Sequence, residues 1–81
     1  MIKYRVNPDY IHAAMEHAVF EEMEGGQGYF GFVPEFPGAW ANQPTLEATR
    51  DELPSVLEGW IELALEGGHE LPDERGIEPA L

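Results

Sequence analysis

The chain has 81 residues, of which 43% are hydrophobic, and its 16 acidic against 4 basic side chains give a formal net charge of −12. We expect no direct binding of nucleic acid or of an anionic membrane, because clusters of Lys and Arg bind both. A chain of this length forms one small domain that leaves apolar surface uncovered, so we expect a homo-oligomer, either a dimer or a tetramer.

The first predicted element is a short helix that begins after Asn7. Asn7 can accept a backbone N–H as the N-cap, and Pro8 suits the first helical position because its missing N–H would have no partner there. Apolar residues then recur at helical spacing. They form one stripe, which consists of Tyr10, Ile11, Ala14, Met15 and Ala18.

A hairpin is predicted next. Residues 18–24 shift towards an extended pattern, and the GGQG sequence at residues 25–28 gives the backbone freedom for a turn. Residues 29–33, with the sequence YFGFV, are rich in aromatic and β-branched side chains that favour a second strand.

A loop and a third strand follow the hairpin. The PEFPG sequence at residues 34–38 predicts a loop, because its two prolines cannot donate to a β-ladder. Residues 39–42 resume an extended pattern around Trp40. Pro44 ends this strand, since a residue that precedes proline avoids the helical region.

The clearest predicted element is a long helix that begins after the candidate N-cap Thr45 and ends at Gly67 and Gly68. Pro54 removes the hydrogen bond to the carbonyl of Arg50, so we expect it to bend the helix. One face of the helix is apolar and the other is acidic. The apolar face consists of Leu46, Thr49, Leu53, Val56, Leu57, Trp60, Ile61 and Ala64.

Together these elements predict an α+β fold. A three-to-four-stranded antiparallel sheet is covered by one long helix in the order β-β-β-α-β, and an extra N-terminal helix precedes it. We expect Leu57 and Trp60 to be the main contribution of the long helix to the core. Phe30 and Phe32 are expected to contribute most from the sheet.

The end of the chain is predicted to be the least regular part of this single domain, residues 1–81. A short fourth strand could form at residues 69–71 or at residues 76–78, whereas residues 73–81 carry mixed charges and a proline and are expected to be poorly ordered. The chain contains no apolar stretch typical of a signal peptide or of a membrane span, so we expect a cytoplasmic protein.

No pattern of residues predicts catalysis, a cofactor or a metal site. There is no cysteine, and Ser55, the only serine, lacks a G-x-S-x-G context. His12 and His17 lie about 140° apart around a helix, unlike the pair of a zinc-binding helix, so we expect no shared metal. Only Glu22 and Glu24 share a face of a predicted strand, and a metal-dependent nuclease would need more carboxylates. We therefore expect a protein that is not an enzyme.

The stretch from Gly28 to Pro72 contains five features in one unbroken order: an aromatic strand, PEFPG, TLE at the start of a helix, LEGWIELAL within that helix, and a Gly-rich exit to LP. In this order they resemble the HicB antitoxin family and its stand-alone HicB-like relatives. The resemblance implies a degraded RNase H-like fold that has lost catalysis. In a full HicB protein this domain covers HicA, a small basic toxin that cleaves mRNA, and a separate C-terminal domain binds operator DNA. Only nine residues follow Pro72, so we expect no C-terminal DNA-binding domain here.

Two functions stay open at this point. The first is a non-enzymatic HicB-like antitoxin-type domain that binds and occludes a small basic partner such as a HicA-like toxin, which the charge of −12 would attract. The second is a solitary oligomeric binding or adaptor domain that has lost its toxin, and solubility alone is the simplest interpretation of the charge. For the first function, exposure and charge suggest a set of partner contacts, namely Glu35, Trp40, Glu47, Asp51, Glu58 and Glu62.

Overall fold

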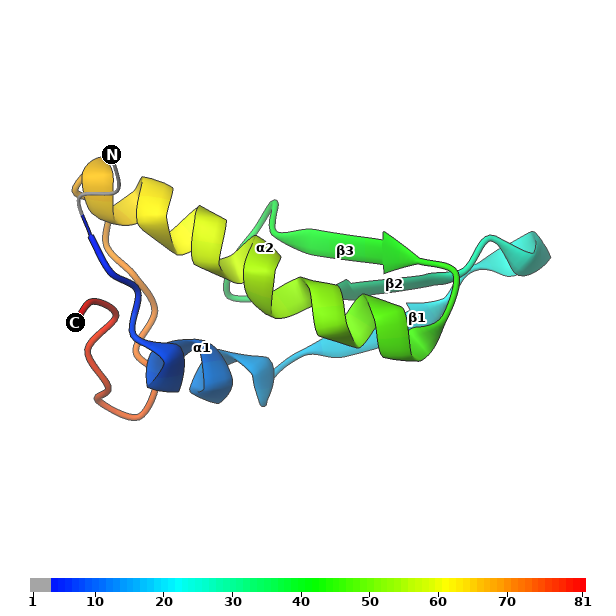
Figure 1. The fold of residues 1–81 in the computed structure, drawn as a ribbon, viewed down its shortest axis with the longest axis horizontal. Coiled ribbons are helices and arrows are strands. Elements are labelled where there is room, and N and C mark those ends of the chain that lie inside the picture. The colour runs from blue at the N-terminus through cyan, green and yellow to red at the C-terminus, as the bar shows by residue number, and fades with distance from the viewer. Residues whose placement is uncertain (1–3) are drawn as a thin grey trace.

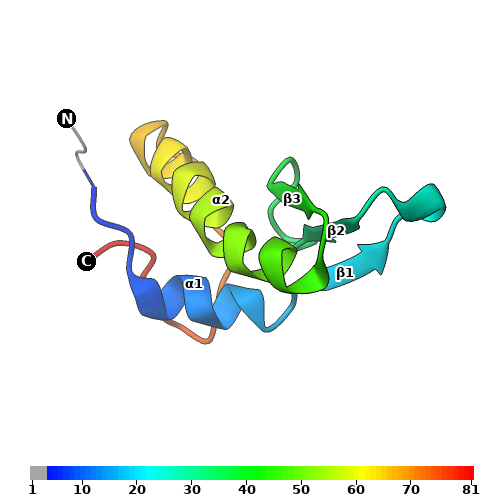
Figure 2. The same ribbon diagram turned by 45° about the vertical axis from the view of Figure 1, so that its right-hand side comes forward.

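A three-stranded antiparallel sheet with two helices forms the fold in the computed structural model, which describes residues 4–81 (Figure 1). The strands are neighbours in chain order, β1-β2-β3. Helix α2 packs on the sheet and helix α1 packs against α2 (Figure 2). In chain order the elements are α1 (Pro8–Met15), β1 (Val19–Glu22), the short 3-10 helix η1 (Glu24–Gly26), β2 (Tyr29–Phe32), β3 (Trp40–Gln43) and α2 (Leu46–Glu66). The α+β class and the three predicted strands are confirmed.

Helix α1 begins as the sequence predicts. The side chain of Asn7 accepts the backbone N–H of Asp9 at 3.0 Å, and Pro8 is the first helical residue. Its buried face includes Tyr10 and Ala14. The helix ends at Met15, before the last residue of the predicted stripe.

The register of the sheet decides which side chains share a face. Phe32 pairs with Val19 of β1 on one side and with Trp40 of β3 on the other. Because successive strand residues point to opposite faces, Gly31 and Ala41 lie on the other side of the sheet, where they are buried beneath α2. We call the surface that carries Val19, Phe30, Phe32 and Trp40 the open sheet face.

The prediction that Phe30 and Phe32 supply the core is wrong. Both side chains are partly exposed on the open sheet face, away from α2. The face beneath α2 carries the small residues Gly31 and Ala41, with the ring of Phe20 over Gly31, and the helix approaches the strands closely there. A Cβ atom on Gly31 would lie only 3.1 Å from Cγ2 of Thr49 in α2.

The core lies between α2, α1 and the loop that joins β2 to β3. Leu57 is fully buried, as predicted, whereas Trp60 lies partly exposed at the margin and donates its indole N–H to the carbonyl of Pro37 at 2.9 Å. The largest buried apolar side chains are Tyr10, Val33, Phe36, Leu53, Leu57 and Ile61.

Helix α2 has both predicted ends. The hydroxyl of Thr45 accepts the N–H of Ala48 at 3.1 Å, and the N–H of Gly67 donates to the carbonyl of Leu63 at 3.0 Å. The helix continues through Pro54 as a single element. Within residues 4–81, no helix combines the length and the apolar character that a bilayer span requires.

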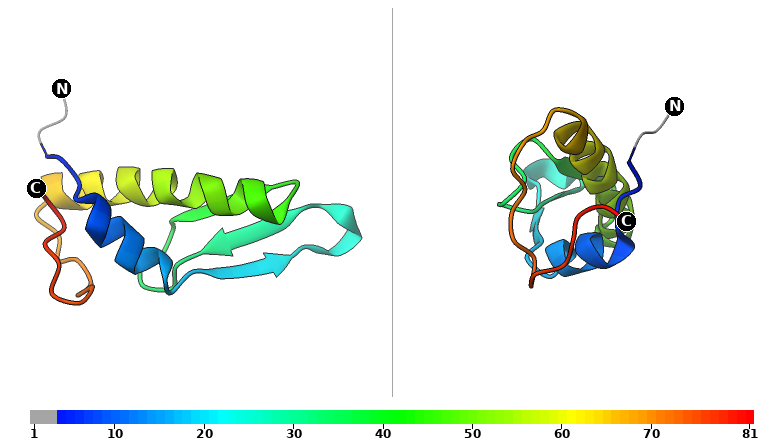
Figure 3. Two further views of the ribbon diagram at one scale, coloured as in Figure 1. Left: turned by 60° about the horizontal axis from the view of Figure 1, so that its bottom comes forward. Right: turned by 90° about the vertical axis from the view of Figure 1, so that its left-hand side faces the viewer.

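No fourth strand joins the sheet within the described part of the chain. The segment after α2 instead folds back beside α1 and residues 5–7 (Figures 1 and 3). Its one β-contact is an isolated antiparallel bridge between Val6 and Ala80. The bridge lies far from the strands, so the predicted final strand of the β-β-β-α-β order is not formed.

Residues 73–81, which we expected to be poorly ordered, are packed against the fold. The carbonyl of Pro79 accepts the N–H of Asn7 at 2.8 Å, and Ile77 packs against the core. Arg75 forms an ion pair with Glu16 at the end of α1. These contacts join the segment to residues that are distant in sequence.

Candidate functional site

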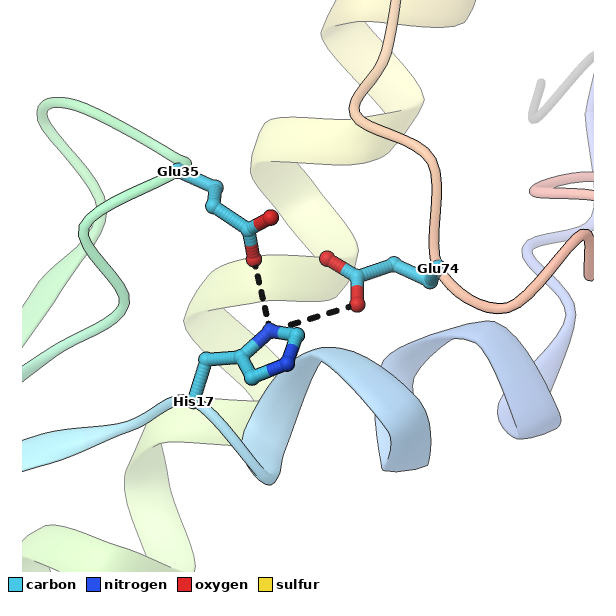
Figure 4. Close-up of side chains that lie close together, drawn as sticks. All are labelled: His17, Glu35 and Glu74. Atoms are coloured by element: carbon cyan, nitrogen blue, oxygen red, sulfur yellow. Dashed lines mark hydrogen bonds and ion pairs between the residues drawn. The ribbon is translucent and has the colours of Figure 1, made fainter.

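Three ionisable side chains from three separate segments meet beside the end of α1 (Figure 4). Nδ1 of His17 lies 2.8 Å from Oε1 of Glu35 and 3.4 Å from Oε1 of Glu74. One possible ligand atom from each residue lies within 4.8 Å of the other two. We call His17, Glu35 and Glu74 the carboxylate–histidine cluster.

Local backbone structure positions two members of the cluster, and packing of the C-terminal segment positions the third. The N–H of His17 donates to the carbonyl of Ala14 at 3.0 Å, which turns the chain out of α1. Glu35 lies in a turn that the hydrogen bond from Phe36 N–H to the carbonyl of Val33 closes at 2.9 Å. Glu74 follows α2 and is therefore brought in only by the packing of the C-terminal segment.

Glu74 is the unusual member of the cluster. Its side chain is 1% exposed, and neither carboxylate oxygen has a hydrogen-bond partner. Burial, followed by the adjacent Glu35 carboxylate, raises the pKa of Glu74 to about 7. Glu74 therefore holds a proton in weakly acidic solution, where an ordinary carboxyl group is ionised.

Each of the two exposed members, Glu35 and His17, favours the charged form of the other. Contact with Glu74, followed by the His17 imidazole, lowers the pKa of Glu35, and the hydrogen bond to Glu35 raises the pKa of His17. Nearby Tyr10 stays protonated, because burial and then Glu74 raise its pKa to about 12. Its hydroxyl donates to the carbonyl of Pro72 at 2.6 Å. Chemically, the cluster can share protons or offer one nitrogen and two carboxylates to a cation.

Sequence reasoning found one member of this cluster and missed two. Glu35 was predicted as a partner contact, and His17 was considered only together with His12. In the structure, His17 faces the two carboxylates instead. Glu74 was overlooked because it lies in the segment that we expected to be poorly ordered. The one sequence feature that could have indicated burial near Glu74 is Ile77, an apolar residue three positions later in the chain.

The structure does not gather the six predicted partner contacts into one surface. Trp40 is 53% exposed on the open sheet face, and Glu35 belongs to the carboxylate–histidine cluster. The remaining four lie on α2, which covers the opposite face of the sheet. Of these four, Glu47, Asp51 and Glu58 are exposed and Glu62 is partly buried.

The open sheet face is an apolar surface that α2 leaves uncovered. The ring of Trp40 stacks on that of Phe30, with centroids 5.6 Å apart and an interplanar angle of 22°. Phe32 adds a third ring, 5.7 Å from Phe30. A groove of about 410 Å³ runs from these rings to the PEFPG loop, where Pro34 and Pro37 border it. The arrangement leaves stacked aromatic side chains accessible on the surface.

Comparisons with known proteins identify relatives of the whole fold. The UPF0150-like family model matches residues 9–72. The crystal structure of TTHA0281 from Thermus thermophilus superposes with a TM-score of 0.74 at 30% sequence identity, covering 90% of this chain and 88% of that one. Among curated proteins no significant match is found. The matched family region includes His17, Glu35 and Trp40 and ends before Glu74.

Proposed function

The chain belongs to the UPF0150-like family, which is related to HicB-like domains, and we propose that it is a non-enzymatic, antitoxin-type domain that binds a small basic protein. The observation that supports this most is the stacked pair of Trp40 and Phe30 on a sheet face that the domain leaves open. The partner that we propose is a HicA-like, mRNA-cleaving RNase, and the proposed place of action is the cytoplasm.

Aromatic side chains held in this way suit an interface. Trp side chains are enriched among the residues that dominate binding energy, because they bury a large area and lose little conformational freedom. The ring of Trp40 is already fixed against Phe30 before a partner arrives. Less ordering on binding leaves more of the contact energy as affinity.

The negative charge of the domain favours a basic partner. The net charge of −12 repels acidic proteins and steers basic ones towards the domain. On the open sheet face itself, the exposed Glu21 pairs in register with Phe30. A basic protein can therefore place apolar groups on the aromatic rings and a Lys or Arg beside Glu21.

Binding of this kind is sufficient to inhibit an RNase. RNA is a polyanion, and an RNase must hold it with a cationic surface. An acidic domain that covers this surface excludes the substrate by occlusion, and no bond needs to be made or broken by the domain itself. The mechanism therefore requires only affinity and complementary charge.

Co-expression with a HicA-like small basic protein, taken from the genes that flank this one, tests the proposed function. We expect the two proteins to copurify in low salt, and we expect the purified domain to stop RNA cleavage by the partner at a one-to-one ratio. Failure to copurify in low salt, or full RNA cleavage in the presence of excess domain, would contradict the proposed antitoxin-type role.

A second candidate function is a solitary homo-oligomeric binding domain, and the same surface favours it. A second copy of the chain could cover Val19, Phe32 and Trp40, which the monomer leaves partly or largely exposed. Light scattering separates the two cases, because the chain has a mass of 9.1 kDa. If the wild type is a stable dimer and Trp40→Ala is a monomer, the open sheet face is the surface of self-association. A monomer at micromolar concentration would contradict self-association and would favour binding of the basic partner to this face.

A further inference from the structure

We propose that His17, Glu35 and Glu74 form a binding site for a divalent transition-metal ion of the zinc type. The three side chains come from separate segments and point towards one another (Figure 4). Each contributes one atom to a group with a span of no more than 4.8 Å. None of the three side chains is on the open sheet face, although Glu35 belongs to the PEFPG loop that borders the groove there.

Glu74 supplies the independent evidence for a missing ligand. Buried carboxylates are normally paired or hydrogen-bonded, because an unpaired buried acid is costly in lost hydration. Both oxygens of Glu74 are buried and make no hydrogen bond of normal length, and they face Nδ1 of His17, 3.4 Å away, and the carboxylate of Glu35. A cation between the three residues would give these oxygens a partner.

The distances are close to those of a coordination shell. Zinc binds imidazole nitrogen and carboxylate oxygen at about 2.0 to 2.2 Å, so two ligand atoms of a tetrahedral site lie about 3.4 Å apart. Nδ1 of His17 is already 3.4 Å from Oε1 of Glu74. The distance from Nδ1 of His17 to Oε1 of Glu35, which is 2.8 Å, would increase by a few tenths of an ångström. Small rotations of side chains would therefore complete the shell.

The donor set favours zinc or manganese over calcium or magnesium. One imidazole and two carboxylates match ions that accept both nitrogen and oxygen ligands. Calcium takes six to eight oxygens, and magnesium keeps most of its water, so three protein ligands with one nitrogen suit neither well. Because 52% of the His17 side chain is exposed, water can fill the fourth position.

A metal ion here would join three parts of the chain. It would tie the end of α1 and the PEFPG loop to the C-terminal segment that carries Glu74. Binding would displace the protons from Nδ1 of His17 and from Glu74, so the affinity would rise with pH. The ion would stabilise the folded state by mass action.

Calorimetric titration of zinc chloride into the full, metal-free chain at pH 7.5 tests the site. We expect one ion per chain, a rise in melting temperature with zinc, and at least about tenfold weaker binding in His17→Gln and Glu35→Gln, since each removes a ligand. These two residues are on the surface, so both variants should fold even if Glu74→Gln does not. His12→Gln, an exposed histidine on α1 outside the cluster, is the matched control and should bind as the wild type does.

A crystal soaked in zinc gives the direct result. An anomalous peak about 2 Å from Nδ1 of His17 and from an oxygen of each carboxylate would establish the site. A peak elsewhere would contradict it. The absence of saturable binding below millimolar zinc would also contradict the site. Equal losses of zinc affinity in His17→Gln and His12→Gln would contradict it as well.

Discussion

Nδ1 of His17 lies 3.4 Å from Oε1 of Glu74, although α1 and the C-terminal segment come from opposite ends of the chain. The contact places a buried carboxyl group beside a half-exposed imidazole. It ties the stability of the fold to the ionisation of Glu74.

The stability of the metal-free protein should decrease as the pH rises from 5 to 8. The folded chain ionises Glu74 only near pH 7, whereas the unfolded chain does so near 4.5, so the unfolded state is favoured progressively across this interval. His17 acts in the same direction, because its pKa is raised in the folded state. We expect a loss of about 2 to 3 kcal/mol from Glu74, measured as the free energy of unfolding in urea with a chelator present.

Glu74→Gln is the control for this pH dependence, since it keeps the shape of the side chain and cannot ionise. The groups that face Glu74 are His17, Glu35, Asp73 and the hydroxyl of Tyr10. The variant retains their own titration and should show a much flatter profile between pH 5 and 8. An equally steep decline in Glu74→Gln would assign the effect to the general charge of the protein.

Gly28→Ala should destabilise the fold by about 2 to 4 kcal/mol. Gly28 has a φ angle of +93°, and an added Cβ would lie 2.4 Å from the backbone carbonyl oxygen of Gln43. Gly59→Ala is the matched control, because nothing lies within 4 Å of its Cβ position on α2. It should stabilise the helix by about 1 kcal/mol. Equal unfolding midpoints for the two variants would contradict the close approach at Gly28.

Thr49→Val should lower the free energy of unfolding by about 1 to 3 kcal/mol. The buried hydroxyl of Thr49 donates to the carbonyl of Thr45 at 2.8 Å and accepts the N–H of Gln43 at 3.2 Å. It therefore links the end of β3 to the first turn of α2. Thr49→Ser keeps this link and should lose only about 1 kcal/mol, through the missing methyl group. A larger loss for Ser than for Val would show that packing, and not the hydrogen bonds, dominates.

Local signals in the sequence predicted most of the fold. Asn7 and Thr45 each cap a helix by accepting a backbone N–H two or three residues further along the chain. The glycines and prolines that end the predicted strands and helices likewise act on residues next to them in sequence. These contacts need no knowledge of the rest of the chain. The three strands and both helices were therefore predicted close to their observed bounds.

The parts that were not predicted depend on contacts between distant segments. The YFGFV pattern shows that Phe30 and Phe32 share a face of their strand, but not whether α2 packs on that face or on the side of Gly31. Nor does the sequence show that the C-terminal segment returns to α1 and buries Glu74. The open sheet face and the carboxylate–histidine cluster both result from such contacts.

Association with the basic partner should depend on salt and on the charge of the open sheet face. Raising the ionic strength from about 0.05 to 0.5 M should slow the association, because salt screens charges that attract over long distances. Glu21→Lys, on the open sheet face, should weaken binding about three- to tenfold. Asp51→Lys makes the same change of charge on α2, away from this face, and should have less effect. Stopped-flow kinetics would measure both variants, and equal effects would indicate that only the net charge matters.

The affinity of Trp40→Ala for the purified basic partner is the most direct test of the proposed function. Leu63→Ala is the matched control, because Leu63 is a large apolar side chain that is 71% exposed on α2. We expect Trp40→Ala to raise the Kd at least about 30-fold, corresponding to about 2 kcal/mol, and Leu63→Ala to leave the Kd within about twofold of the wild-type value. Wild-type affinity in Trp40→Ala, or an equal loss in both variants, would contradict binding through the open sheet face.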